Sequence, residues 1–285
     1  MYQNQNDREH AYYVYAVAQS QDSREPGPLP AEGIVPQVSV STLTYRDLLA
    51  VVSPVPLAEF GPLALEDHLQ DADWAQARVL AHQQVLAALL DGYTLVPFKF
   101  CTLYHSWVRV REMLAWHYEA LNQALQRLKG ATEWGVKLYC DRRALMEWVR
   151  KDSGVLQSQR EAIAQASAGV GYFLRKKLEQ EAEEEVERVM DVCVNESHWH
   201  LADCAREAVT NPVQPPTVHG HKAEMVLNSA YLVDEIDLEA FRRTLAILER
   251  SYAPQFRYEL TGPWPPYNFA TLELEEVTDE SSPVE

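Results

Sequence analysis

Residues 256–269 read FRYELTGPWPPYNF. Apolar and charged side chains alternate over the first five positions, which is the period of a half-buried β-strand. Three prolines follow Gly262; each lacks an N–H donor and fixes φ at roughly −65°, so we expect the strand to end at Gly262. The sequence therefore predicts a stiff loop that carries Trp264, Tyr267 and Phe269. Such a loop is either a corner that buries its aromatic side chains, the commoner outcome, or a docking surface for a partner.

Upstream of this loop, strand and helix signals alternate through the second half of the chain. We expect strands over 134–139, 223–233 and 256–261, and helices over 142–150, 172–194 (continuing or restarting over 199–209) and 237–250. This order is the β-α-β…α-β rhythm of a ferredoxin-like α+β unit with added helices.

The first half is less regular and is compatible with a modified ferredoxin-like α+β unit. Its expected elements are strands over 11–18, 38–44, 48–53 (stopped by Pro54 and Pro56) and 93–100, a loop or broken helix over 57–73, and helices over 74–90 and 107–128. We place the boundary near Gly130, which predicts an N-terminal domain over 1–130 and a C-terminal domain over 131–270. Residues 271–285 contain six acidic residues and no basic residue, so we expect a solvated, disordered tail.

The composition is that of a soluble globular protein, with 47% hydrophobic and 24% charged residues among 285. Its formal net charge of −17 repels phosphate groups, and no stripe of Lys and Arg offsets that charge, so we expect neither nucleic acid nor membrane as a partner. The four cysteines show no CxxC spacing, which is typical of free thiols in a reducing cytosol. No signal-peptide core and no apolar segment of spanning length occurs, so we expect an intracellular protein.

Motifs that would identify an enzyme are missing from the sequence. No Walker loop, GxSxG elbow or HExxH motif occurs, and the glycines around Val170 lack the third member of a dinucleotide fingerprint. One cluster has metal-ligand chemistry: His198, His200, Asp203, Cys204, His219 and His221. A zinc site is one interpretation, but surface histidines are the better one, because the second histidine pair lies beyond a proline-broken loop. We predict no catalytic residue, no bound metal and no cofactor.

Residues 261–269 strongly resemble the GPWPPY-type signature near the end of the gas vesicle protein F/L family. Further segments resemble that family in order along the chain: AYYVYAVA (11–18), VVSPVP (51–56), YTLVPFKF (93–100) and WGVKLY (134–139). One position departs from the family pattern, because Cys101 stands where members usually have glycine. That departure puts the local backbone geometry in question. The resemblance implies the same two-domain α+β arrangement.

The resemblance also implies a function. It implies an accessory component of the gas-filled protein shell, cytoplasmic before assembly, that contacts the very hydrophobic major shell protein and other gas vesicle accessory proteins. An acidic protein with an apolar docking patch can hold such an aggregation-prone subunit in a soluble complex. The candidate docking residues are Trp264, Pro265, Pro266, Tyr267, Phe269, Leu57, Phe60 and Leu63. The alternative function is a ferredoxin-like sensor or enzyme that binds a small molecule or metal, which the His/Cys cluster alone supports.

Overall fold

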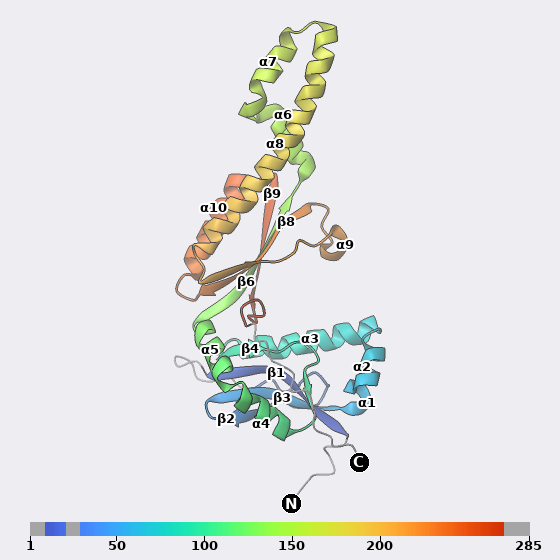
Figure 1. Ribbon diagram of the computed structural model, residues 1–285, viewed down its shortest axis with the longest axis vertical. Helices are drawn as coiled ribbons and strands as arrows, with labels where there is room; N and C mark the ends of the chain where they lie inside the picture. The colour runs from blue at the N-terminus through green and yellow to red at the C-terminus, as the bar shows by residue number, and fades with distance from the viewer. Residues whose placement is uncertain (1–8, 21–28, 271–285) are drawn as a thin grey trace, which may run out of the picture. The chain divides into compact units, whose positions relative to one another are not determined.

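The computed structural model describes residues 9–20 and 29–270, and its contacts divide the chain into two compact units (Figure 1). Unit 1 consists of residues 1–131 and 264–285, and unit 2 of residues 132–263. The first boundary therefore lies within two residues of Gly130. Residues 264–270, which we expected in the C-terminal domain, group with unit 1 because Tyr267 packs against its core. The expected acidic tail over 271–285 lies outside the described residues.

Unit 1 is built on an antiparallel sheet with the strand order β2-β3-β1-β4, in which β5 also pairs with β1. The first strand lies inside the sheet and the second at its edge, as in a ferredoxin-like unit. The strands are β1 (His10–Ser20), β2 (Ser41–Tyr45), β3 (Leu48–Pro56), β4 (Tyr93–Pro97) and β5 (Leu103–Tyr104). A segment without helix in its described part joins β1 to β2, so the modification that we expected concerns the first crossover.

The helices of unit 1 cover both faces of this sheet (Figure 1). They are α1 (Leu57–Phe60), α2 (Pro62–His68), α3 (Ala72–Leu89), α4 (Trp107–Trp116) and α5 (Tyr118–Leu128). The core between β1 and α3 includes Tyr13 and Tyr15 from the strand and Val85, Leu86 and Leu89 from the helix. Because alternate strand residues share a face, the two tyrosines point to the same side, toward α3.

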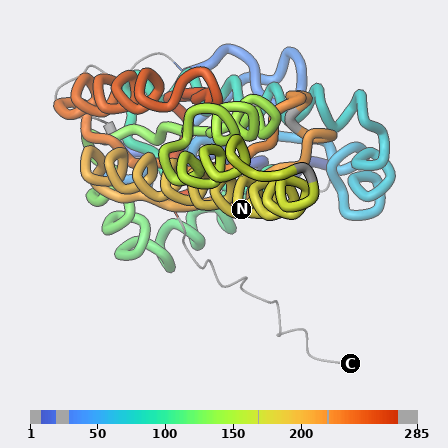
Figure 2. Tube along the Cα trace, turned by 90° about the horizontal axis from the view of Figure 1, so that it is seen from above, coloured from blue at the N-terminus to red at the C-terminus, as the bar shows by residue number. Residues whose placement is uncertain are grey.

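Unit 2 contains a second sheet with the order β7-β8-β6-β9, which again places its first strand inside and its second at the edge. Its elements are β6 (Ala131–Cys140), α6 (Arg142–Asp152), a 3-10 turn (Gly154–Leu156), α7 (Gln157–Gln165), α8 (Ala168–Ala202), β7 (Glu207–Thr210), α9 (Pro216–His219), β8 (Glu224–Asp234), α10 (Leu238–Tyr252) and β9 (Phe256–Trp264). Helices α8 and α10 run side by side (Figure 2), and their apolar faces pack on β6 and β8. The fold is therefore α+β in both units, as predicted.

Two strands run further than their prolines led us to expect. β3 continues through Pro54 and Pro56, because β2 pairs with it only up to Val52 and leaves one edge of β3 without a ladder there. β9 continues past Gly262 to Trp264, since it is the edge strand of its sheet. A proline without an N–H donor is tolerated at such an edge.

Two helix predictions were also wrong in part, and one helix was not predicted. The helix expected over 107–128 breaks at His117. As a result α4 packs against β2 and β3, whereas α5 packs against β4 and β1. Residues 207–209 of the expected helical extension belong to strand β7 and pair with β8, which shows tertiary pairing overriding helical propensity. Helix α7 was not predicted, because it buries no residue and has no strong apolar stripe.

Candidate functional site

The aromatic loop after β9 is a compact turn seated on unit 1. The N–H groups of Tyr267 and Ala270 donate to the carbonyls of Pro265 and Pro266 at 2.7 and 2.8 Å, so the prolines serve as acceptors only. Gly262, near the end of β9, has a φ of 127°, a value that side-chain-bearing residues rarely adopt. The sequence thus builds a loop with few alternative backbone conformations.

Tyr267 attaches this loop to the core through a chain of hydrogen bonds centred on His82. The Tyr267 hydroxyl lies 2.7 Å from His82 Nε2, and the Tyr13 hydroxyl lies 2.8 Å from His82 Nδ1. The two ends set the direction of donation: Tyr267 donates to the Phe98 carbonyl at 3.3 Å, and the Cys101 N–H donates to Tyr13 at 3.1 Å. Each phenol has one proton, so His82 donates from Nε2 and accepts from Tyr13 at Nδ1. Neutral imidazole satisfies every member of the chain.

Burial keeps His82 in this neutral state. The side chain is 1% exposed, stacks on Tyr15 at a ring distance of 5.8 Å and meets Phe100 edge-on at 6.0 Å. Desolvation lowers the pKa of His82 from 6.5 to about 4. Burial also raises the pKa of Tyr267 to about 12, so its phenol remains a donor. The site therefore has the chemistry of a structural anchor, with no charged group at its centre.

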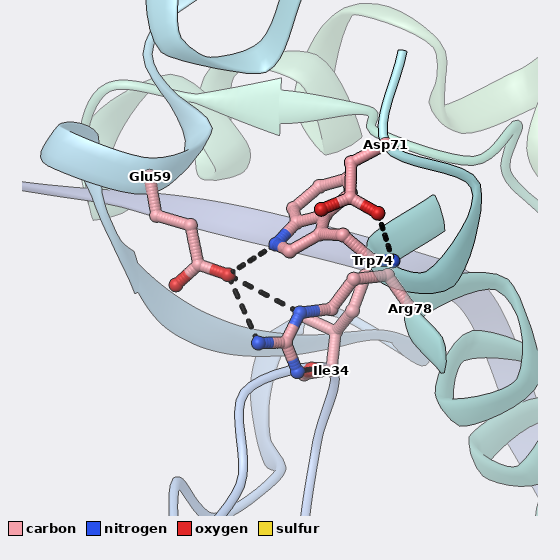
Figure 3. A network of polar contacts seen from close by, with 5 residues as sticks. All are labelled: Ile34, Glu59, Asp71, Trp74 and Arg78. Atoms are coloured by element: carbon pink, nitrogen blue, oxygen red, sulfur yellow. Dashed lines mark hydrogen bonds and ion pairs between the residues drawn. The ribbon is translucent and has the colours of Figure 1, made fainter. Parts of the chain in front are cut away.

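Helix α1, which is distant from the loop in the sequence, contacts the same aromatic cluster. Phe60 is fully buried, and its ring lies 6.3 Å from that of Tyr13 and 5.6 Å from that of Trp74. Glu59 secures α1 to α3, because one of its carboxylate oxygens accepts from Trp74 Nε1 at 2.8 Å and from Arg78 at 3.0 Å (Figure 3). The two segments of the candidate docking surface are thus linked inside unit 1, because α1 contacts Tyr13 and the loop contacts His82, which bonds to Tyr13.

The eight candidate docking residues divide into buried and exposed ones. Phe269, Phe60, Pro265 and Pro266 are buried, and Leu57 and Tyr267 are half-buried. The four buried side chains hold the loop and α1 in position, and a direct contact of theirs with a partner stays a prediction. Trp264 is 45% exposed and Leu63 is 83% exposed. These two side chains are the members of the set that a partner can reach.

Cys101 adopts the left-handed conformation that its family position suggested. Its φ is 64°, and its N–H is held by Tyr13. A side chain in this region of φ is strained, whereas glycine is not. We expect Cys101→Gly to raise the free energy of unfolding by about 0.5–1 kcal/mol, as measured by urea denaturation. Cys101→Ser, which retains the Cβ atom, is the control and gives no such gain; equal effects of both substitutions would contradict the strain explanation.

Three members of the candidate zinc cluster, His198, Cys204 and His221, contact different neighbours. Within residues 9–20 and 29–270, no three His, Cys, Asp or Glu side chains are placed to share a metal ion. His198 contacts the Tyr231 hydroxyl at 3.0 Å, and Cys204 contacts Thr244 at 3.5 Å. His221 instead lies 2.9 Å from Arg257. In the same described part of the chain, no helix combines the length and apolarity needed to cross a bilayer.

His82 and Arg127 support the loop and were not identified from the sequence. His82 continues the buried face of α3 with Val85, Leu86 and Leu89, so its helical spacing was a usable signal. Arg127, in the last turn of α5, donates to the Phe269 carbonyl, and no local pattern signals a contact between positions so far apart. Both contacts depend on how the chain folds back on itself.

The chain matches known proteins over nearly its whole length. The family described as "Gas vesicle synthesis protein GvpL/GvpF" matches residues 11–271. "Gas vesicle protein L" of Streptomyces sp. (strain CB03234) is 31% identical over 275 residues, which cover 93% of this chain and 94% of that protein. "Gas vesicle protein F" of Haloferax mediterranei is 23% identical over 265 residues, covering 92% and 94%.

Two solved structures share the fold. The gas vesicle protein GvpF from Anabaena sp. PCC7120 superimposes with a TM-score of 0.64 and 17% identity, covering 92% of this chain and 97% of that one. GvpF from Microcystis aeruginosa gives a TM-score of 0.60 and 17% identity, covering 92% and 99%. At this identity the structures establish the fold, while the family match establishes kinship. The chain belongs to the GvpL/GvpF family of gas vesicle proteins.

Proposed function

We propose that this gas vesicle protein binds the hydrophobic major shell protein in the cytoplasm, before assembly. In this proposal it then assists nucleation and growth of the vesicle. The observation that supports this function most directly is Trp264, a half-exposed indole next to a loop whose other aromatic residues are anchored. A rigid aromatic side chain loses little conformational entropy on binding, so it is efficient as a contact. Leu63, on the short helix α2, offers a second exposed apolar side chain.

The charge of the chain supports the same function. With a net charge of −17, complexes that each contain this protein repel one another. An apolar subunit held at a small contact on such a body is kept from aggregating. The buried Phe269 and the half-buried Tyr267 contribute by fixing the loop. Other gas vesicle accessory proteins are further partners in this proposal.

We expect Trp264→Ala to reduce capture of the major shell protein by about tenfold or more, because aromatic anchors dominate interface energy. The measurement is a quantitative pull-down of tagged shell protein, co-expressed with the full chain. Trp116→Ala is the matched control, since Trp116 is an even more exposed tryptophan in the same unit. Leu63→Ser tests the second contact. Undiminished capture by a folded Trp264→Ala variant would show that the proposed contact is wrong.

A further inference from the structure

The N-terminal end of α8 and the helix before it, α7, form a surface that differs in charge and polarity from the rest of the molecule. Residues 157–177, here called the arm tip, comprise α7, the turn after it and the first turns of α8. Within unit 2 this part extends beyond the end of the sheet (Figure 1). It has four basic residues and one acidic residue, whereas the whole chain has 25 and 42. The arm tip is thus a basic region on an acidic protein.

The arm tip also exposes apolar side chains. Val170, Tyr172 and Phe173 are 55%, 62% and 71% exposed, and the two rings contact each other at 5.7 Å. Three exposed apolar or aromatic side chains within four successive positions are unusual on a solvated helix face. Neighbouring Arg175 and Lys176 are exposed as well. The surface therefore combines an apolar centre with cations beside it.

The remaining polar groups at the arm tip favour an anionic ligand. Arg160 is engaged internally, since it donates to the carbonyls of Arg150 and Ser153 at 3.0 and 2.7 Å. Helix α8 begins here, and Ser167 at its N-cap makes no side-chain cap bond. The N-terminal end of a long helix carries partial positive charge, which adds to that of the cations. An acidic polypeptide with apolar residues complements all three features.

We propose that the arm tip binds residues 271–285 of a second copy of this chain. That segment reads TLELEEVTDESSPVE and contains six acidic residues and no basic residue. Leu272, Leu274 and Val277 supply apolar side chains for the aromatic pair, and the acids beside them face the cations. The contact is head-to-tail, because the tip of one copy meets the C-terminal segment of the next, so it links successive chains.

The test is self-association of the full chain. Sedimentation equilibrium of the wild type is expected to show concentration-dependent association, which a synthetic peptide of residues 271–285 in excess reverses. Arg175→Glu/Lys176→Glu is expected to lower the association constant at least about tenfold, because two attractive pairs become repulsive. Arg143→Glu/Lys151→Glu on α6 makes the same change in net charge at exposed positions and leaves association unchanged.

A charge swap separates this contact from other causes. A chain with Glu275→Lys/Glu276→Lys is expected not to self-associate, but to bind the Arg175→Glu/Lys176→Glu chain when the two are mixed. A wild type that stays monomeric at all concentrations overturns the proposal, even if the peptide binds, because the segment then acts within one chain. Binding of phosphatidylglycerol vesicles in place of the peptide also overturns it, in favour of a lipid surface. Shell-protein capture by Trp264 is unaffected by either result.

Discussion

Phe269→Ala is expected to lower the free energy of unfolding by roughly 3–5 kcal/mol, the usual cost of removing a buried phenylalanine. Phe269 is 2% exposed, and its carbonyl accepts from Arg127. The truncation leaves a cavity under the turn and loosens the segment that carries Trp264. Urea denaturation of the full chain, followed by circular dichroism, measures the loss.

Trp264→Ala is the control for this experiment, because Trp264 ends β9 only five positions before Phe269. Trp264 is half-exposed, so its truncation is expected to cost less than about 1 kcal/mol. The two variants therefore separate stability from binding: the first destabilises the protein, and the second impairs capture of the shell protein. Equal losses of stability would contradict the division of the loop into an anchor and a contact.

Unit 1 is expected to lose stability as the pH falls from 6.5 to about 4, through His82. The folded state keeps this imidazole neutral, with its pKa lowered to about 4, whereas the unfolded chain binds a proton near the ordinary value of 6.5. Its contribution is therefore fully present above pH 6.5 and lost progressively below it. The difference between the two pKa values corresponds to roughly 3 kcal/mol. Protonation also places a donor at Nδ1, against the hydroxyl proton of Tyr13.

The variant His82→Leu isolates this effect from the titration of carboxylates. Leucine fills part of the space and does not titrate, so the variant is less stable than the wild type at pH 7 and closer to it at pH 4. The measurement is the difference in unfolding free energy between the two proteins at several pH values. A difference that stays constant from pH 7 to pH 4 would show that His82 is not held neutral in the fold.

Local sequence patterns predicted most elements of this fold. The alternation in residues 256–260 identified β9, and the helical spacing of Leu238, Phe241, Leu245 and Leu248 identified α10. Errors occurred where a long-range contact competes with a local preference. The expected helix over 107–128 breaks at His117 because α4 and α5 pack against different strands, and residues 207–209 of an expected helix pair with β8 instead. A local sequence pattern contains no information about a strand's pairing partners when these are distant in the sequence.

The sequence by itself determined that a stiff aromatic loop follows the last strand, since prolines restrict the backbone whatever surrounds them. It also determined the acidic charge and the family kinship. Only the tertiary structure decided which aromatic residue is buried, because Tyr267 and Phe269 are held by His82 and Arg127, 185 and 142 positions away. The local sequence does not distinguish Trp264 from Phe269, because both are aromatic residues of the same proline-rich stretch. Burial is a property of contacts between distant segments, so it appears only once the chain has folded.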